Sequence, residues 1–295
     1  MKKLALVCIT ISSFGLFGCK STPVQIDAQP LMTNHSEAYN IANQTALLRD
    51  KSPLKDFTIE EVADIETELN KQSNGGKYVA ALGALSVLSG NLTGVIDIAG
   101  GSASMIANSD HASAYSRWIV AIPKSEFSDI GQAQKYMLSE IENAAIQYFG
   151  QYGKVYFGDS SLSGHINLFL DYEGQKINLG LYSNPHFQDN VHGVETYWNV
   201  TDEDVYLFGA AKRAYVTSEV AIGPPALSHL LVNKVTDKSY SQIQKEFTAY
   251  LPSGFYMYIP SFPQQYIHGE GKYQALNHIV PSIYTEGRQL DFIKP

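Results

Sequence analysis

A long stretch without charge constrains the fold of this chain more than any other feature. Residues 78–96 contain no charged side chain, and after Asp97 a second uncharged run continues to Ser109. The apolar residues lie all round the expected helix, which is typical of a segment that is buried on every side. A stripe of small residues would also let two helices approach closely, in a membrane or in a packed core. This stripe has a spacing of four and consists of Ser86, Gly90 and Gly94.

The apolar segment 78–108 allows two placements. A turn at Ser89-Gly90-Asn91 would divide it into helices over 78–89 and 92–107, which together form a hairpin. A buried hairpin in a soluble domain suits its Ser, Asn, Thr and Asp side chains, because polar groups in hydrocarbon need partners. The other placement is membrane insertion within an oligomer. Both placements stay open.

The N-terminus has the form of a secretory signal. Met1-Lys2-Lys3 is followed by an apolar run over residues 4–17, and a positive start before a short apolar stretch is typical of a cleaved leader. The run is shorter than the roughly 20 residues that a membrane-spanning helix needs. Its end, Leu16-Phe17-Gly18-Cys19, resembles the lipobox of bacterial lipoproteins. The resemblance implies cleavage between Gly18 and Cys19, a diacylglycerol on the Cys19 thiol, and an acyl chain such as palmitate on the new amine.

Lipidation would fix the chain to a membrane. Each buried methylene contributes about 0.8 kcal/mol and one acyl chain anchors only marginally, so two or three chains on Cys19 would hold the protein firmly. Lipoproteins retained in the inner membrane typically carry Asp after the lipidated cysteine, whereas this chain has Lys20. The resemblance therefore implies the outer membrane, on its periplasmic face or at the cell surface, with the lipid bilayer as a partner through acylated Cys19.

Composition excludes several classes of function. The formal net charge is −8, and it becomes more negative by two when Lys2 and Lys3 leave with the leader. No basic run is present, which disfavours nucleic-acid binding because that binding depends on neutralising phosphates. Cys8 leaves with the leader and Cys19 becomes a thioether, so we expect neither disulfides nor cysteine metal ligands. With 44% hydrophobic residues, the mature chain can form a stabilising core instead.

The periodicity of the mature chain predicts an α+β fold, with N-terminal helices that include the apolar Gly/Ala/Ser-rich hairpin, then a mixed α/β sheet region, and a Tyr-rich C-terminal strand segment. The expected organisation is a signal peptide over 1–18, a lipidated tether over 19–35, a helical region over 36–110, an α/β sheet domain over 111–222, and helices with C-terminal strands over 223–295. The last two regions can belong to one domain.

Local signals predict individual elements. Ser36 would cap a helix reaching Asp50, and Thr58 with Glu61 has the spacing of a capping box. A helix over 129–149, capped by Ser125 or Ser128, should cover one face of a sheet in a strand–helix–strand–hairpin unit. The strands are expected at 117–122, 155–157, 165–170, 176–181, 195–200, 205–208, 214–222 and 255–259, with further helices at 225–234 and 239–250 and a terminal hairpin over 283–292.

The best candidate for a metal site is a polar loop with two histidines and nearby carboxylates. Its candidate ligands for a divalent metal are His186, Asp189, His192 and Glu195. The same residues suit a polar surface for a partner, or a solvated turn in which Asn, Asp and Gly are chosen for backbone conformation. Phosphate-binding loops, nucleophile elbows and zinc-protease spacing are missing. We therefore expect no catalytic residue, no metal and no cofactor.

Tyrosines are concentrated near the C-terminus. Tyr buries a ring while its hydroxyl stays available to a partner, so Tyr256, Tyr258 and Tyr266 are candidate interface residues. They also suit ordinary strands. Tyr256 and Tyr258 would share one face of a strand, with Phe255 and Met257 on the other.

Three functional classes follow. The first is a non-catalytic envelope lipoprotein that binds or scaffolds envelope protein partners in a secretion, conjugation or surface assembly. The second is a membrane-embedded homo-oligomer built by segment 78–108. For this class the chain is similar to surface-exclusion lipoproteins of conjugative plasmids, which combine a lipobox, a glycine-rich apolar hairpin and an α/β domain. The third is an envelope hydrolase that uses scattered carboxylates or histidines.

Overall fold

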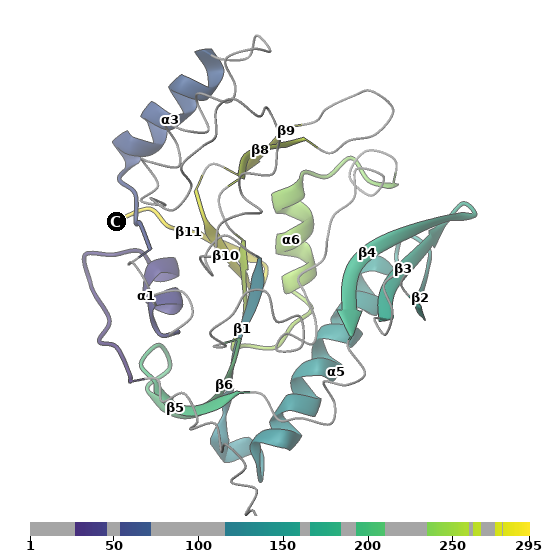
Figure 1. The fold of residues 1–295 in the computed structure, drawn as a ribbon, viewed down its shortest axis with the longest axis horizontal. Coiled ribbons are helices and arrows are strands. Elements are labelled where there is room, and N and C mark those ends of the chain that lie inside the picture. The colour runs from purple at the N-terminus through teal and green to yellow at the C-terminus, as the bar shows by residue number, and fades with distance from the viewer. Residues whose placement is uncertain are drawn as a thin grey trace, which may run out of the picture.

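The computed structural model describes residues 27–45, 54–71, 116–159, 166–183, 193–209, 235–259, 262–266, 275–278 and 280–295. These residues form helices and antiparallel sheets, so the expected α+β class is confirmed (Figure 1). The predicted leader 1–18, the apolar segment 78–108, the strand 214–222 and the helix 225–234 lie outside the described residues.

The elements follow in chain order. They are α1 (Glu37–Asn43), α3 (Ile59–Lys71), β1 (Arg117–Pro123), the 3-10 helix η3 (Lys124–Glu126), α5 (Ile130–Phe149), β2 (Lys154–Asp159), β3 (Ile166–Tyr172), β4 (Gln175–Ser183), β5 (Val194–Trp198), β6 (Glu203–Phe208), α6 (Tyr240–Thr248), β7 (Phe255–Ile259), β8 (Phe262–Tyr266), β9 (Ala275–His278), β10 (Ser282–Thr285) and β11 (Arg288–Asp291).

The centre of the molecule is a six-stranded antiparallel sheet with the order β11-β10-β7-β1-β6-β5. Strand β1 divides its side chains between two hydrophobic cores. Trp118, Val120 and Ile122 pack with α5 and α6. Ile119 and Ala121 pack on the opposite face with α1 and Phe57. Both faces of the sheet are therefore covered, which explains why the strand is apolar without alternation.

Helix α5 has the predicted buried face but a different cap. Its buried residues include Ala133, Met137, Ile141, Ala144 and Tyr148. Asp129, rather than Ser125 or Ser128, caps the helix, because its carboxylate accepts the Gln132 N–H at 2.9 Å. The Ser128 hydroxyl donates to the other oxygen of that carboxylate.

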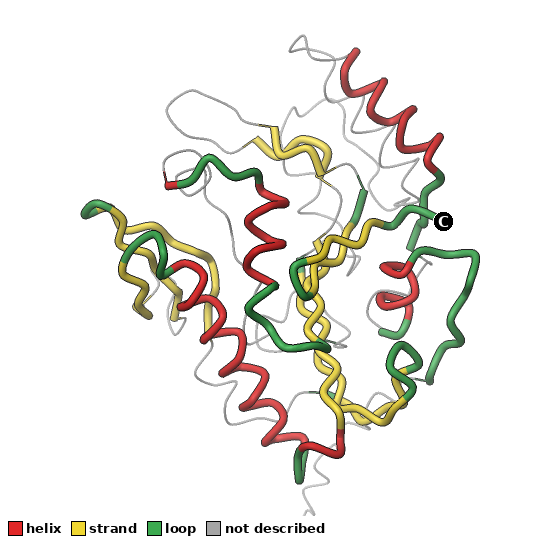
Figure 2. The backbone as a smooth tube through the Cα atoms, turned by 180° about the vertical axis from the view of Figure 1, so that it is seen from behind, coloured by secondary structure: helices red, strands yellow, loops and turns green. Residues whose placement is uncertain are grey.

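Strands β2, β3 and β4 form a separate three-stranded sheet, which we name the wing. It projects from the end of α5 at the edge of the molecule (Figures 1 and 2). The predicted β3–β4 hairpin is confirmed, and both turn residues, Glu173 and Gly174, have positive φ. The wing buries one face against the α5 core, as expected. The prediction that β1, α5 and the wing form a single strand–helix–strand–hairpin unit is wrong, because β1 pairs with the distant strands β6 and β7 in the six-stranded sheet.

Several local predictions have clear outcomes. The capping box that starts α3 is confirmed, since Thr58 N–H donates to Glu61 Oε2 at 2.9 Å and Glu61 N–H to Thr58 Oγ1 at 3.2 Å. Ser36 caps α1, but this helix ends at Asn43 instead of continuing to Asp50. The terminal hairpin turns at Glu286 and Gly287, as predicted.

Candidate functional site

Residues 27–36, which we name the strap, lie against the domain instead of hanging free. The side chain of Gln44 binds both backbone polar groups of Gln29. Its Nε2 donates to the Gln29 carbonyl at 2.8 Å, and its Oε1 accepts the Gln29 N–H at 3.3 Å. Asn199, which follows β5, donates to the same carbonyl at 2.6 Å. The predicted tether 19–35 is therefore wrong over residues 27–35, because amide side chains take the hydrogen-bonding role of a neighbouring strand.

A second amide fixes the middle of the strap. Asn40 on α1 accepts the Met32 N–H at 2.8 Å and donates to the Met32 carbonyl at 3.0 Å. The Met32 side chain packs on the core that contains α1 and Phe57. The strap is thus held by its backbone polar groups and by apolar contact.

A buried carboxylate holds the end of the strap. The Asp56 side chain is 1% exposed and accepts the Ser36 N–H and the Ser36 hydroxyl, each at 2.8 Å. His35 Nδ1 lies 3.1 Å from Asp56 Oδ2, and the His35 ring stacks on Tyr39 with centroids 4.0 Å apart. Burial raises the pKa of Tyr39, and the Asp56 charge raises it further. We name the group Ser36, His35 and Asp56 the Asp56 cluster.

The Asp56 cluster contains the residue types of a serine hydrolase but not their arrangement. Ser36 Oγ accepts the Tyr39 N–H at 3.1 Å while its proton goes to Asp56, so the hydroxyl is engaged as a helix cap. A nucleophilic serine needs a histidine base within hydrogen-bond reach, whereas here serine and histidine both bind the aspartate. The geometry fits an anchor for the strap.

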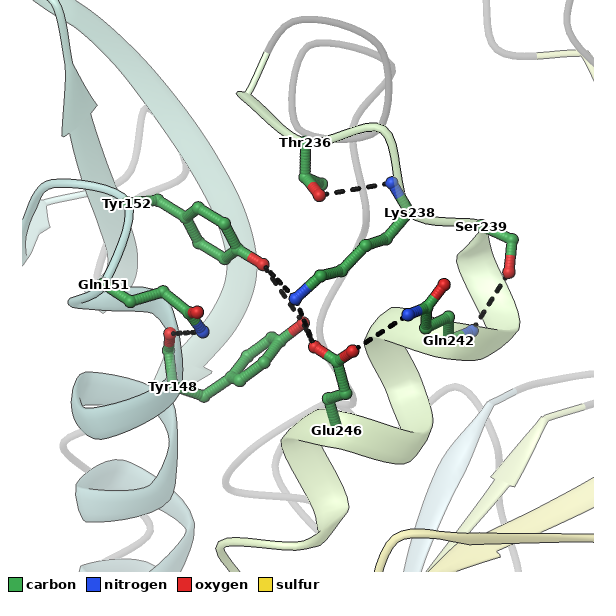
Figure 3. Close-up of polar contacts among 8 residues, drawn as sticks. All are labelled: Tyr148, Gln151, Tyr152, Thr236, Lys238, Ser239, Gln242 and Glu246. Atoms are coloured by element: carbon green, nitrogen blue, oxygen red, sulfur yellow. Dashed lines mark hydrogen bonds and ion pairs between the residues drawn. The ribbon is translucent and has the colours of Figure 1, made fainter.

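A polar network joins α5 to α6, and Figure 3 shows its side chains converging from the two helices, from the turn after α5 and from the segment before α6. Lys238 Nζ lies 2.6 Å from Glu246 Oε2 and donates to the Tyr152 hydroxyl at 3.2 Å. The Tyr148 hydroxyl donates to the same Glu246 oxygen at 3.1 Å. We name Tyr148, Tyr152, Lys238 and Glu246 the helix clamp.

The charges of the helix clamp stabilise each other. The hydrogen bond to Glu246 raises the pKa of Lys238. Burial alone would raise the pKa of Glu246, but hydrogen bonds from Lys238, Gln242 and Tyr148 outweigh it and lower the pKa. Burial and the hydrogen bond with Tyr152 raise the pKa of Tyr148. These shifts keep Lys238 and Glu246 charged and Tyr148 protonated at neutral pH, so the contacts among the three side chains hold the helices together.

The predicted metal-binding loop is described only at its end. His186, Asp189 and His192 lie outside the described residues. Glu195, on β5, is exposed and forms an ion pair with Lys124 at 2.6 Å. In the described part of the chain, no group of three His, Cys, Asp or Glu side chains is placed to hold a metal ion.

Two of the three tyrosines predicted at an interface belong to the core. Tyr256 is 6% exposed and Tyr258 is 1% exposed, because β7 lies between β1 and β10 in a sheet covered on both faces. The interface prediction is therefore wrong for both. The predicted division of faces is confirmed: Phe255 and Met257 pack on the α5 side, and the tyrosines on the α1 side. Tyr266 lies in β8, and its side chain is not described.

The predicted cleavage, lipidation and helix-packing residues belong to other parts of the chain. Gly18, Cys19 and the small-residue stripe Ser86, Gly90 and Gly94 lie outside the described residues. Among the helices that the structure describes, none has the length and apolar character needed to cross a bilayer.

Sequence reasoning missed the strap, the Asp56 cluster and the helix clamp. The Ser36 cap was visible locally, but its partner Asp56 lies twenty positions away with no spacing that signals contact. The clamp joins Tyr148 to Glu246 across ninety-eight positions. The contact between these side chains could have been predicted only if the packing of α5 on α6 were already known.

Comparison with known proteins adds no relative: no family model matches the chain, and neither the curated proteins nor the solved structures gave a match. Function has to be inferred from the sequence signals and from the contacts described above.

Proposed function

We propose that this chain is an outer-membrane lipoprotein, anchored through acylated Cys19, that acts as a non-catalytic binding or scaffold component of an envelope assembly. The observation that carries the proposal is Leu16-Phe17-Gly18-Cys19 at the end of a charged and then apolar leader. The outer membrane is favoured by Lys20 after the cysteine.

The contacts of the folded part support a binding role over a catalytic one. The Asp56 cluster uses its serine as a helix cap, and in the helix clamp Lys238 and Glu246 keep their ordinary charge states. The strap fixes the start of the domain close behind Cys19. These features suit a rigid body that is mounted on a membrane and presents its surface to neighbours.

Labelling with a fatty acid tests the anchor. Cells making the wild-type chain and the Cys8→Ser variant should incorporate labelled palmitate equally, because Cys8 leaves with the leader. The Cys19→Ser variant should incorporate none and should not be processed at Gly18–Cys19. Label that persists in Cys19→Ser would contradict the proposal.

Co-purification tests the scaffold role. The acylated protein, cross-linked in intact envelopes, should recover a defined envelope protein in a constant ratio, and surface substitutions that leave the fold intact should abolish the recovery. A chain that is recovered alone at every cross-linker concentration would contradict a scaffold role.

The alternative is a membrane-embedded oligomer formed by segment 78–108, in the manner of surface-exclusion lipoproteins. The uncharged run 78–96 favours it. A carbonate wash of membranes that contain the Cys19→Ser variant distinguishes the anchored domain from the membrane-embedded oligomer. An anchorless soluble domain should be released, whereas an inserted hairpin should stay in the membrane pellet.

An envelope hydrolase is the remaining alternative. Alanine at His186, His192 and Glu195 tests it, since metal content and hydrolytic activity should both fall if these residues form a site. We expect neither quantity to change.

A further inference from the structure

The length of chain between the lipidation site and the strap limits how the domain can sit on a membrane. Eight peptide steps separate Cys19 from Asp27, where the described chain begins. A fully extended chain spans at most about 3.6 Å per residue, so this linker reaches at most about 29 Å. A free tether extending to His35 would reach about 58 Å by the same rule. The docked strap therefore halves the reach.

The strap is held to the domain by several hydrogen bonds, so it does not add to the length of the flexible linker. Gln29 is bonded to Gln44 and Asn199, Met32 to Asn40, and Ser36 to the buried Asp56. These contacts come from α1, from the turn after β5 and from the segment before α3. Releasing the strap would expose several paired polar groups at once, which is costly.

The strap begins beside the turn between β5 and β6, on the side of the molecule opposite the wing (Figures 1 and 2). Two exposed apolar side chains belong to this side: Leu31 of the strap is 47% exposed, and Tyr197 of β5 is 40% exposed. Tyrosine suits the boundary between water and lipid, because it combines an apolar ring with a polar tip. The end of the neighbouring turn and the start of β6 are acidic, with Asp202, Glu203 and Asp204, so the face suits zwitterionic headgroups better than anionic ones.

We propose that the strap orients the domain on the bilayer, with the strap and the β5–β6 turn facing a zwitterionic phospholipid surface and the wing directed away from it. This inference rests on the proposed acylation of Cys19. It assigns the membrane-facing surface and leaves the wing as the outermost part of the described structure, free to meet a partner.

Single cysteines can test the orientation, because the mature acylated chain is expected to have no free thiol. Thr201, in the β5–β6 turn, and Gln175, beside the tip of the wing, are both exposed. Thr201→Cys and Gln175→Cys would each carry a donor fluorophore on the acylated protein, reconstituted in phosphatidylcholine vesicles with acceptor-labelled lipid. We expect stronger energy transfer from position 201 than from position 175.

A linker insertion provides the matched control, because it leaves every described contact intact. Adding about 20 Gly/Ser residues between Ser21 and Thr22 gives a flexible tether and should abolish the difference between the two positions. Equal transfer in vesicle-bound protein without the insertion, or stronger transfer from position 175, would overturn the orientation. Protein that lacks the acyl mass and does not bind vesicles would instead overturn the proposed anchor.

Discussion

The carboxylate of Asp56 shows how one residue can fix a segment far away in the sequence. It is buried, and its two oxygens accept from the backbone and the hydroxyl of Ser36 while His35 lies against it. A buried charge is tolerated only when its hydrogen-bonding capacity is satisfied. The strap supplies these partners, so the ordering of the strap and the burial of Asp56 depend on each other.

Asp56→Ala should lower the free energy of unfolding by about 3 kcal/mol, because two buried donors of Ser36 lose their acceptor. Asp56→Asn should cost less, since one amide oxygen remains as an acceptor. Asp64→Ala, at an exposed position of α3, is the matched control and should leave stability unchanged. Urea unfolding measures all three, and equal stability of Asp56→Ala and Asp64→Ala would contradict the role of Asp56.

Gly209 is required by the close approach of two strands. It has a φ of +86°, and a Cβ there would lie 2.0 Å from the Trp118 carbonyl oxygen of β1. Gly209→Ala should cost at least about 2 kcal/mol, because the contact is with backbone that cannot move aside. Gly174 also has a positive φ, but a Cβ added there would meet nothing within 4 Å. Gly174→Ala should therefore cost only about 1 kcal/mol. Thermal unfolding of the pair checks this, and similar losses in both would count against the steric explanation.

At the scale of elements, local signals predicted what the chain does over short distances. The capping box of α3, the buried face of α5 and the turn at Glu173-Gly174 all follow from residues within a few positions of each other. The pairing of Arg117 with Tyr258 does not follow from neighbouring residues, because nothing near either position specifies a partner so far away in the sequence. The fold class was thus predictable, whereas the order of strands in the sheet was not.

The same contrast applies to the candidate site. Tyr256 and Tyr258 alternate with Phe255 and Met257 as a strand requires, and this was predictable. Their burial was not, because a tyrosine in a strand can face solvent or core depending on what covers the sheet. The strap escaped prediction because its polar, Pro-containing sequence is typical of a linker, and its partners Asn40, Gln44 and Asn199 act through side-chain amides.

The helix clamp should give the packing of α5 on α6 a defined pH dependence. A lowered pKa of Glu246 in the folded state stabilises the fold above the unfolded carboxyl value of about 4.3, and this contribution is lost as the pH falls through the folded value. A raised pKa of Lys238 stabilises the fold below about 10.4, and this contribution is lost as the pH rises through the folded value. The clamp should therefore stabilise the fold most between these limits.

Glu246→Gln should lower the free energy of unfolding at pH 7 by up to about 1 kcal/mol, since the pair is partly exposed and screened. The difference from wild type should shrink on acidification, when Glu246 is protonated in both proteins. Glu126→Gln, at an exposed position, is the control and should show no difference. A loss for Glu246→Gln that does not change between pH 7 and low pH would contradict the electrostatic explanation.

At the scale of the whole molecule, the strap is the segment that would connect the proposed anchor to the fold. The six-stranded sheet carries a covered core on each face, the strap lies on the α1 side, and the wing extends from the α5 side (Figures 1 and 2). A short linker before a docked strap would turn a general membrane attachment into a fixed orientation. The proposed role as a binding component depends on this arrangement, because it determines which surface is available to a partner.

The most direct test of the account is the mass of the N-terminal peptide from protein extracted from the membranes of its native host. The account predicts a peptide that begins at Cys19 and carries a diacylglycerol on sulfur together with an acyl chain on the amine. An unmodified N-terminus, or a leader that remains uncleaved through Gly18, would contradict it.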